Sequence, residues 1–485
     1  MNSAGNSGGQ YKPLSQAQVE TIHSASLSLL ESVGFTFEAG LDDTLAMLQE
    51  AGCRVDRGQQ RIYFPSDLVR EQVSHAPSRV ILHGRKDSAD LDLYADRVHL
   101  GTGGSALNIL DLESGQARQS VLRDIYDIGR LVDSLDNIHF YLRPCIPHDI
   151  PEDAYDVNSL YACLKSTGKH VMIGFTNEQG VRDGIEMAAM LAGGLEKLQK
   201  RPFISTVACF AISPLKLCTQ STLNMQESCR KNIPVAISSA PMAGSTSPMT
   251  MAGTLVQLHA EEMAGLVIGQ LTHPGSPQLY GGIPGMADLR TMGYSGGAVE
   301  FGMMNAAIHQ MADHIKVPNY NSSGLSDSKI PDAQAGWEKA FTTLLAAMGG
   351  SNYVHHAAGM LESMLCLAYE QYVMDDEIIG QACKVLEGII VDEEHLALDA
   401  IAQVGPGGNY MMSPHTMRHM RSEFFGGNGS TDRALRVNWE RAGSLDARSR
   451  ARNIAREILA RAEAPYISPE LDTMIRERFD ILLAD

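Results

Sequence analysis

The sequence predicts an α/β protein built as a (β/α)8 barrel with an N-terminal α+β cap and a C-terminal helical extension. Eight apolar runs each end in Gly, Ser, Asn or His, and each is followed by an amphipathic helical pattern. Such alternation implies parallel strands joined by right-handed crossovers, and eight units close most naturally into a barrel. The alternative is an open doubly wound sheet. No GxGxxG turn follows the first run, so the dinucleotide-binding form of that alternative lacks its signature.

The predicted strands share an apolar body and a polar end. They lie within residues 98–110, 138–148, 170–177, 202–213, 234–244, 277–285, 314–324 and 352–360. The clearest unit is the segment 319–337, NYNSSGLSDSKIPDAQAGW, where small and polar residues follow an apolar run and lead into a helical pattern. Small residues allow a close approach of backbone to ligand, and the polar ones supply hydrogen bonds. Because barrel active sites lie at the carboxyl ends of the strands, these ends are expected to form the site.

Three segments are expected: a cap (1–95), the barrel (96–388) and a helical extension (389–485). In the cap, Ser15 and Gln18 form a capping box that predicts a helix over 15–33. Residues 1–12 are rich in Gly and Ser and are expected to be disordered. In the extension, charge runs such as 446–456 are expected to be solvated helix faces that pack on the barrel or on a second subunit.

The composition limits the partners. A formal net charge of -18 and a pI near 5.3 argue against nucleic acid or an anionic membrane as partner. No apolar run reaches the roughly 18 residues that cross a bilayer, and no secretory leader is visible, so a cytoplasmic location is expected. Eight cysteines are scattered without a CxxC pair, which fits reduced thiols better than disulfides or a zinc site.

The strand ends supply a polar and mostly neutral set of side chains. It comprises Asn108, His148, Asn177, Ser213, Ser239, Tyr280, Asn321, Asp327, His355 and His356. His355 and His356 could ligate a metal, but adjacent residues of a strand face opposite sides, which favours hydrogen bonding or packing. The glycine-rich turns at 101–104, 281–285 and 349–350 could cradle a phosphate or simply allow tight turns. Glu300 lies in a pattern typical of buried residues, so it is either ion-paired or functional.

Four long segments resemble the trimethylamine methyltransferase family. They are GGIPGMADLRTMGYSGGAVEF (281–301), NSSGLSDSKIPDAQAGWEKA (321–340), GGSNYVHHAAGMLES (349–363) and VDEEHLALDAIAQVGPGGNYMMSPHTMRHMRSEFF (391–425). The likeness is to the branch without pyrrolysine, which includes glycine betaine methyltransferases. It implies a barrel that transfers a methyl group from an amine to the cobalt of a separate corrinoid protein, with no tightly bound cofactor of its own.

The resemblance also implies a substrate class. Pyrrolysine is thought to activate trimethylamine, and this chain contains only standard residues. A quaternary ammonium already carries its charge and releases a neutral tertiary amine, so it needs no general acid. A betaine, most simply glycine betaine, is therefore the expected methyl donor.

The expected roles follow from that chemistry. A quaternary nitrogen is best held by aromatic faces and a carboxylate, and its own carboxylate by a cation such as Arg290. The candidate catalytic residues are Glu300, Asp327 and His355. The candidate substrate-binding residues are Tyr280, Arg290, Tyr294, Tyr320, Asn321, Tyr353 and His356. No metal ligand is expected in the site.

Two alternatives stay open from the sequence. A zinc-dependent cobalamin methyltransferase would need a convergent set such as Cys209, His148 and His355. A betaine-binding protein that lacks transfer activity would keep the barrel alone. The long C-terminal helices also make a homo-oligomer possible.

Overall fold

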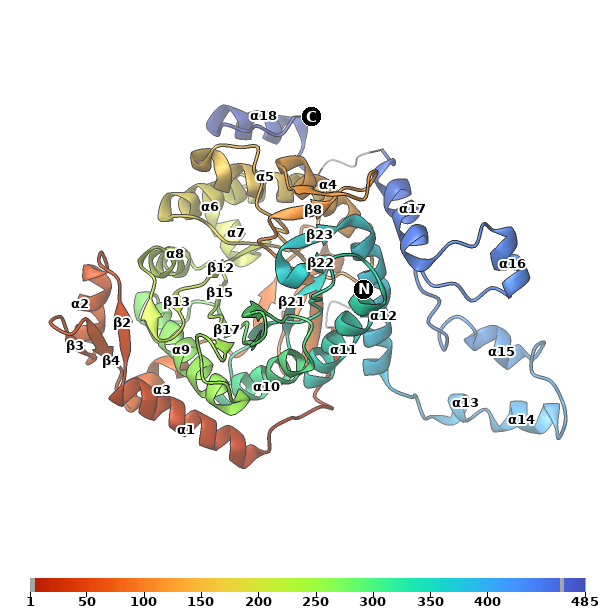
Figure 1. Cartoon of the computed structure of the whole chain (residues 1–485), viewed down its shortest axis with the longest axis horizontal. Coiled ribbons are helices and arrows are strands. Elements are labelled where there is room, and N and C mark those ends of the chain that lie inside the picture. The colour runs from red at the N-terminus through yellow and green to blue at the C-terminus, as the bar shows by residue number, and fades with distance from the viewer. Residues whose placement is uncertain (1–4, 463–465, 485) are drawn as a thin grey trace.

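The computed structural model describes residues 5–462 and 466–484, and eight parallel strands form the centre of this part of the chain (Figure 1). Each predicted run contains one of them. They are β7 (Arg97–Thr102), β10 (Tyr141–Leu142), β11 (Val171–Ile173), β12 (Ile204–Ala208), β15 (Val235–Ile237), β17 (Gln278–Gly282), β20 (Asn319–Ser322) and β21 (Tyr353–Ala358).

The strands neighbour one another in chain order. Parallel pairing runs from β10 through β11, β12, β15, β17 and β20 to β21, which pairs in turn with β7. The flanks of β7 and β10 are also bonded, because the His139 amide donates to the Leu100 carbonyl at 2.8 Å. The Thr102 hydroxyl donates to the Leu142 carbonyl at 2.8 Å. The first and second strands of the eight therefore lie side by side.

Helices surround the strands (Figure 1). They are α4 (Leu122–Asp133), α5 (Tyr155–Ser166), α6 (Glu178–Ala192), α7 (Leu195–Lys200), α8 (Thr219–Arg230), α9 (Met251–Thr272), α10 (Val299–Ile315), α11 (Ala333–Gly349) and α12 (Tyr369–Glu387), with the 3-10 turn η2 (Glu152–Ala154) before α5. Polar side chains cap the first turn of two of these helices. Asn177 accepts from the Gly180 amide at α6, and Asp332 accepts from the Ala335 amide at α11.

A hairpin covers the amino ends of the strands. Its two strands are β5 (Val80–Leu82) and β6 (Leu91–Leu93), joined through η1 (Asp87–Ala89). The four leucine and valine side chains at the ends of β5 and β6 belong to one apolar cluster with inward residues such as Phe140 and Leu279. The His83 amide donates to the Pro202 carbonyl at 3.0 Å, just before β12. Because the amino ends are filled, space for a ligand remains at the carboxyl ends.

The rest of the N-terminal segment packs on the outside. It contains β1 (Asn6–Ser7), α1 (Gln16–Ser32), β2 (Phe35–Phe37), α2 (Asp42–Glu50), β3 (Arg54–Asp56), β4 (Arg61–Tyr63) and α3 (Ser66–His75). The predicted capping box is confirmed at Ser15 and Gln18. The expected disorder of residues 1–12 is wrong for β1, which pairs antiparallel with β7, while residues 1–4 lie outside the described residues. β2 joins β13 (Ala211–Ile212) and β14 (Lys216–Leu217) in one sheet, so this segment is continuous with the core.

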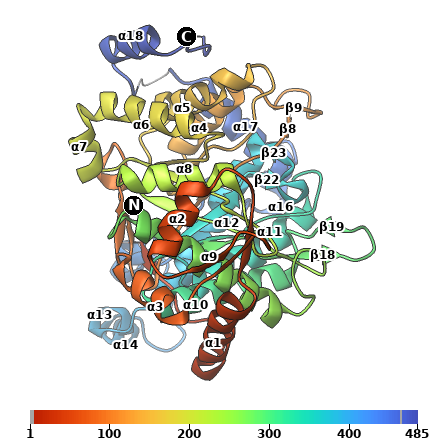
Figure 2. The ribbon, with the colours of Figure 1, turned by 90° about the vertical axis from the view of Figure 1, so that its left-hand side faces the viewer.

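Two small sheets stand beyond the carboxyl ends of the central strands (Figure 2). One contains β16 (Met242–Ala243), β18 (Gly285–Asp288) and β19 (Gly293–Tyr294). The other contains β8 (Asn108–Leu110), β9 (Ala117–Gln119), β22 (Met360–Leu361) and β23 (Cys366–Ala368), with the turn η3 (Glu362–Met364) between the last two. Both arise from chain inserted between a central strand and its helix, so they form the rim of that end.

The C-terminal extension has two unlike parts. α17 (Ala447–Leu459) packs on α12 and α4, and α18 (Pro469–Arg478) packs on α6. The predicted solvated face at 446–456 is wrong in part, because Arg448 and Arg452 each pair at 3.0 Å with Glu370, whose side chain is buried.

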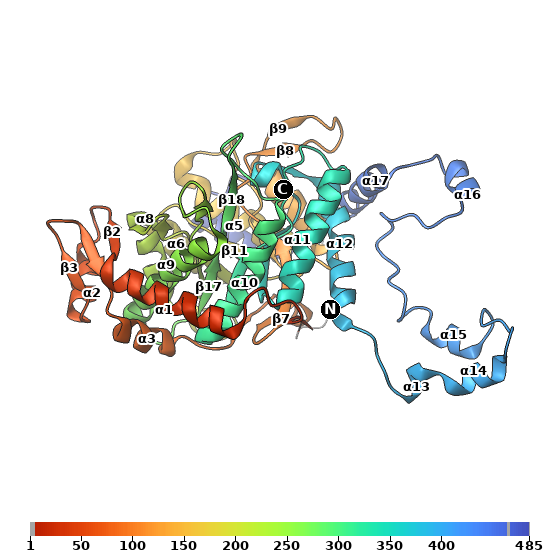
Figure 3. The ribbon, with the colours of Figure 1, turned by 60° about the horizontal axis from the view of Figure 1, so that its bottom comes forward.

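Residues 389–446, called the arm below, make two excursions from the body (Figures 1 and 3), and the stretch between them returns to α12, where the Asn428 side chain donates to the Val373 carbonyl at 2.7 Å. The arm carries α13 (Glu393–Leu396), α14 (Leu398–Val404), α15 (Pro414–His419) and α16 (Arg436–Arg441), none of which has a buried residue. Across the described residues, no helix is both long enough and apolar enough to cross a membrane.

Candidate functional site

A cavity of about 480 Å³ opens at the carboxyl ends of the strands, and we call it the mouth cavity. Its walls come from the ends of β7, β10, β11, β12, β20 and β21, so residues far apart in the chain meet there. Its lining includes the side chains of Arg143, Tyr155, Cys209, Tyr320, His355 and His356.

A second cavity of about 810 Å³ lies under the β18–β19 hairpin, and we call it the hairpin cavity. Its polar and aromatic lining includes Asp288, Tyr294, Asp327 and Glu362. Ile283 and the segment 363–365 line both cavities. The two cavities therefore adjoin at this shared wall.

His355 and His356 both face the mouth cavity. The register of β21 shifts between Val354 and Ala358, and His356 has a φ of 64°, in the left-handed region. This β-bulge turns the second side chain to the same side as the first, and the two ring centroids lie 3.9 Å apart. The expectation that the two side chains face opposite sides of the strand is wrong, because it assumed a regular strand.

Both imidazoles are neutral at pH 7. Burial lowers the pKa of His356 to about 3 and that of His355 well below its ordinary value. His356 Nδ1 lies 2.7 Å from the Ser322 hydroxyl, and the His355 ring stacks on Tyr320 at 4.3 Å between centroids. His355 Nε2 is buried without a hydrogen-bond partner in the described chain. The pair thus offers uncharged ring surface to a ligand in the mouth cavity.

Close packing accounts for glycine in two of the predicted glycine-rich turns. A Cβ on Gly103 would lie 1.7 Å from Cδ2 of His356. A Cβ on Gly285 would lie 2.0 Å from Cε2 of Tyr294. Glycine at these positions makes room for site side chains, so neither turn needs a phosphate to explain it.

Arg143 brings a buried positive charge to the mouth cavity. It follows β10 directly, and its exposure is 7%. One guanidinium nitrogen donates to the Cys145 carbonyl at 2.9 Å and to the Tyr155 hydroxyl. Its Nε is buried and has no hydrogen-bond partner among the described residues. Arg143 lines the mouth cavity, and a guanidinium in such a place is suited to binding a carboxylate.

Acidic groups lie on the other side of the shared wall. Asp327 accepts from the Gly296 amide at 2.9 Å and from the Ser363 hydroxyl. Glu362 also lines the hairpin cavity. The adjoining cavities therefore carry a cation on one side and carboxylates on the other.

The shared wall has a strained backbone. Glu362, Ser363 and Met364 have φ values of 50°, 51° and 86°. Left-handed conformations of such residues cost on the order of 1–3 kcal/mol each and persist where surrounding contacts enforce them, often at functional sites. Here the Glu362 amide donates to the Ser328 carbonyl at 2.9 Å and the Ser363 amide to the Ser326 carbonyl at 2.8 Å. The loop after β20 thus fixes the wall between the cavities.

A buried ion pair supports the loops from behind. Lys339 Nζ lies 3.2 Å from a carboxylate oxygen of Asp375, with side-chain exposures of 1% and 0%. The lysine also donates to the Met360 carbonyl at 3.1 Å, and the carboxylate accepts from the Gly359 amide at 2.7 Å. Burial raises the pKa of Asp375 to about 6. The pair joins α11 and α12 to the chain that follows β21.

Five of the ten predicted site residues line the cavities. Tyr320, His355 and His356 lie in the mouth cavity, and Tyr294 and Asp327 lie in the hairpin cavity. Burial raises the pKa of Tyr294 above its ordinary value.

The other five lie elsewhere. Tyr280 faces the helices, where its hydroxyl lies 2.8 Å from Nδ1 of His259, and Asn321 donates at 2.7 Å to the Asn305 carbonyl. Tyr353 belongs to the apolar cluster beneath the β5–β6 hairpin, stacked on Phe140 at 3.6 Å between centroids. Glu300 is half-buried in the first turn of α10. Arg290 is 89% exposed and pairs with Asp288 at 2.7 Å.

Sequence reasoning missed Arg143, Tyr155 and the segment 363–365. Arg143 could have been found, because it is a lone charge at the end of the second predicted strand. Nothing in the sequence marks the other residues, which reach the cavities from loops and from the start of a helix.

A zinc centre in the mouth has little support from the ligands present. Cys209 and His355 line the same cavity, but His148 is exposed and lies outside that lining. Within the described ranges, the group of three or more His, Cys, Asp or Glu side chains that could hold a metal ion is His395, His419 and Glu423, in the arm.

The fold and cavities define an α/β protein that presents a polar binding site at the carboxyl ends of parallel strands. Residues 2–480 match the family model of trimethylamine methyltransferase (MTTB). The chain is 36% identical over 445 residues to trimethylamine methyltransferase MttB of Desulfitobacterium hafniense, covering 92% of this chain and 88% of the relative. It is 31% identical to a glycine betaine methyltransferase from another strain of that species, covering 96% of each. The chain belongs to the trimethylamine methyltransferase family.

Solved structures agree on the fold. The monomethylamine methyltransferase MtmB of Methanosarcina barkeri aligns with a TM-score of 0.51 over 94% of this chain and 95% of its own. A hydroxylamine complex of MtmB gives a TM-score of 0.52 over the same shares. Identity is 10% in both cases, so the likeness concerns the fold alone.

Proposed function

We propose that this protein transfers a methyl group from a carboxylated quaternary amine, glycine betaine first, to the Co(I) of a corrinoid protein or of cobalamin. The nitrogen–methyl bond breaks with its electron pair left on nitrogen, which becomes a neutral tertiary amine, and the methyl carbon bonds to cobalt. No proton moves in this step. The chain's own task is therefore to bind the donor, aim its methyl group outward and exclude water.

The observation that carries the proposal is the separation of charge across the adjoining cavities. A betaine is a zwitterion, so it fits a site with a cation on one side and carboxylates on the other. Arg143, whose side chain lines the mouth cavity, receives the substrate carboxylate. This is the role that the sequence suggested for Arg290, which is exposed and already paired.

The ammonium end is held by ring faces and by charge. Tyr155 and Tyr320 line the mouth cavity, and each ring face in contact with the cation contributes on the order of 0.5–2 kcal/mol. His355 and His356 add neutral ring surface that does not repel the cation. Asp327, fixed by the Gly296 amide and the Ser363 hydroxyl, balances the charge from the hairpin cavity.

We also propose that the eight strands close into a (β/α)8 barrel (96–388), with a cap before it (1–95) and a helical extension after it (389–485). The hydrogen bonds between the flanks of β7 and β10 support closure. The corrinoid comes from a partner protein that docks on the rim formed by the two small sheets, and the chain holds no tightly bound cofactor. Reduced Co(I) requires a reducing compartment, and the eight cysteines are free thiols, so we propose a cytoplasmic location.

A homo-oligomer is part of the proposal. The arm exposes large apolar side chains, among them Ile389 at 92%, Val391 at 74% and Met412 at 86%. The arm begins at the end of α12 that lies opposite the rim (Figure 3). A protein docked on the rim therefore does not cover the first residues of the arm. A second copy of the chain is the natural cover. Sedimentation analysis should give a mass above one chain, and a monomer at micromolar concentration would contradict this part.

The decisive experiment offers the purified protein reduced cob(I)alamin, or a reduced corrinoid protein, with a panel of amines. Formation of methylcobalamin is followed by absorbance with glycine betaine, carnitine, choline and trimethylamine as donors. We expect transfer from the carboxylated quaternary amines and little from trimethylamine. Equal rates with choline and glycine betaine would show that the enzyme does not recognise the substrate carboxylate. Binding of glycine betaine without methyl transfer would show that the protein only binds it.

A further inference from the structure

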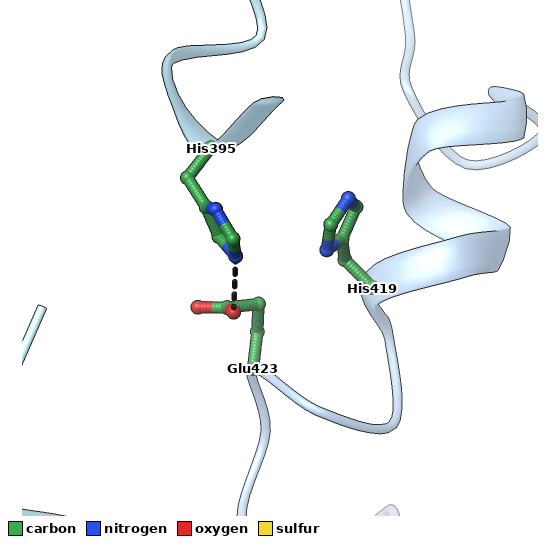
Figure 4. A group of neighbouring side chains, drawn as sticks. All are labelled: His395, His419 and Glu423. Carbon is green, nitrogen blue, oxygen red and sulfur yellow. Dashed lines mark ion pairs between the residues drawn. The ribbon is translucent and has the colours of Figure 1, made fainter. Parts of the chain in front are cut away.

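His395, His419 and Glu423 converge in the arm (Figure 4). One ligand atom from each lies within 4.8 Å of the others, and His395 Nε2 lies 3.8 Å from Glu423 Oε1. A hydrogen bond between such atoms would be about 2.9 Å long. Two ligands of a tetrahedral zinc ion, each about 2.0–2.2 Å from the metal, lie roughly 3.3–3.5 Å apart. The distance between His395 Nε2 and Glu423 Oε1 is therefore closer to that between two ligands of one zinc ion than to that of a hydrogen bond.

The surrounding groups orient these side chains. The Asp392 carboxylate lies 2.6 Å from His395 Nδ1, which leaves Nε2 directed at Glu423. A carboxylate behind a histidine in this way is typical of metal-ligating imidazoles. The Glu423 amide donates to the His419 carbonyl at 3.0 Å, so their side chains lie one helical turn apart. Glu394 Oε1 lies 3.3 Å from His419 Nε2 and can supply a further oxygen.

The arm has no apolar core to hold this geometry. α13, α14 and α15 contain no buried residue, yet α13 and α15 place their histidines together. Short segments that cannot bury enough apolar surface commonly depend on a metal ion. An ion here would join α13 to α15 and close the loop 396–418, which contains the glycine-rich break at 405–408. Both ligand-bearing stretches belong to the segment 391–425, which the proposed methyl transfer leaves unexplained.

We propose that the arm binds one divalent transition-metal ion, Zn²⁺ first, through His395, His419 and Glu423, and that this ion fixes the fold of the arm. Two imidazoles and a carboxylate favour zinc over Ca²⁺ or Mg²⁺, which prefer ligand sets made only of oxygen. The fourth position is filled by Glu394 or by water. The site is separate from the mouth and hairpin cavities, so its test does not depend on the methyl-transfer reaction.

The test uses the full-length protein, stripped with a chelator and dialysed, and measures binding of Zn²⁺ by calorimetry and of Co²⁺ by visible absorption. We expect one ion per chain and the absorption bands of a low-coordinate cobalt site. His395→Ala, His419→Ala and Glu423→Gln should each weaken Zn²⁺ binding at least tenfold. His273→Ala, which removes an exposed histidine elsewhere, is the matched control and should bind as the unchanged chain does.

Limited proteolysis supplies a second readout that does not depend on a variant. Zn²⁺ should slow cleavage within 396–418 of the unchanged chain and should not do so in His395→Ala. Because α13 and α15 contain no buried residue, these variants should retain the thermal unfolding of the body. Zn²⁺ binding that is equal in all variants, or absent from the unchanged chain, would overturn the proposal and leave a surface cluster of ion pairs.

Discussion

The mouth of the central sheet and the arm both gather polar side chains, but they hold them by different means. In the mouth, Arg143, His355 and His356 are almost completely buried, and strand ends fix their positions. In the arm, His395 and His419 lie on short helices that contain no buried residue. Packing can preorganise the first site without a ligand, whereas the second depends on an ion or a second copy. Substitutions should therefore act on function and stability in the mouth, and on metal binding and association in the arm.

The largest effect is expected for Arg143→Ala. It should lower kcat/KM for glycine betaine by about 100-fold or more, since losing one partner of a buried charged hydrogen bond costs roughly 2–5 kcal/mol. Transfer from choline, which lacks the carboxylate, should change less than about threefold. Steady-state assays with both donors measure the difference.

Arg290→Ala is the matched control for that substitution. Its side chain is exposed and pairs with Asp288, so kcat/KM for either donor should stay within about threefold of the unchanged protein. A similar loss with both donors in Arg143→Ala would mean that Arg143 shapes the cavity rather than binding the carboxylate.

Breaking the buried ion pair comes next. Lys339→Met should lower the free energy of unfolding by about 3 kcal/mol at pH 8, because it leaves the Asp375 carboxylate buried without its cation. Denaturant unfolding measures the loss.

The loss should shrink as the pH falls. The pKa of Asp375 in the folded protein is about 6, above its ordinary value, so this group destabilises the folded state as the pH rises through the window from about 4 to 6. Near pH 5 the carboxyl is largely protonated and needs no cation. A loss that is the same at pH 5 and pH 8 would contradict the electrostatic explanation, and adding Asp375→Asn should restore part of the stability at pH 8.

A smaller effect is expected for Gly103→Ala, whose new methyl group would overlap the His356 ring. The cost should be about 1–3 kcal/mol in stability, and the displaced ring should raise KM for betaine. In a background that carries His356→Ala the clash is gone, so Gly103→Ala should cost much less there. If the stability losses of Gly103→Ala and His356→Ala simply add in the double variant, the new methyl group does not clash with the His356 ring.

The smallest effect on the chain itself is expected in the arm. Leu398 is 68% exposed, so Leu398→Ser should change the free energy of unfolding by less than about 0.5 kcal/mol. The buried counterpart Leu279→Ala should cost about 2–5 kcal/mol. The arm substitution should instead weaken self-association in sedimentation. A large loss of stability without any change in mass would show that Leu398 is covered within one chain.

Much of the fold could be predicted because its signals are local. All eight predicted runs contain a strand of the central sheet, and the Ser15 capping box starts α1 as expected. The site was predicted less completely. Tyr320, His355 and Asp327 line the cavities, but Tyr280 and Asn321 point at the helices. On strands this short, a shift of one residue in the expected alternation moves a side chain from the inside to the outside.

The sequence by itself determined the alternation of strands and helices, the end of the strands at which the two cavities open, and the likeness to methyltransferases, because each depends on residue types at short range. Only the tertiary structure decided that a bulge turns His355 and His356 into one cavity, that Arg143 rather than Arg290 is the buried cation, and that His395 meets His419. These features arise from contacts between segments distant in the chain. No local pattern of residues encodes such contacts, because they depend on how separate strands and loops pack together.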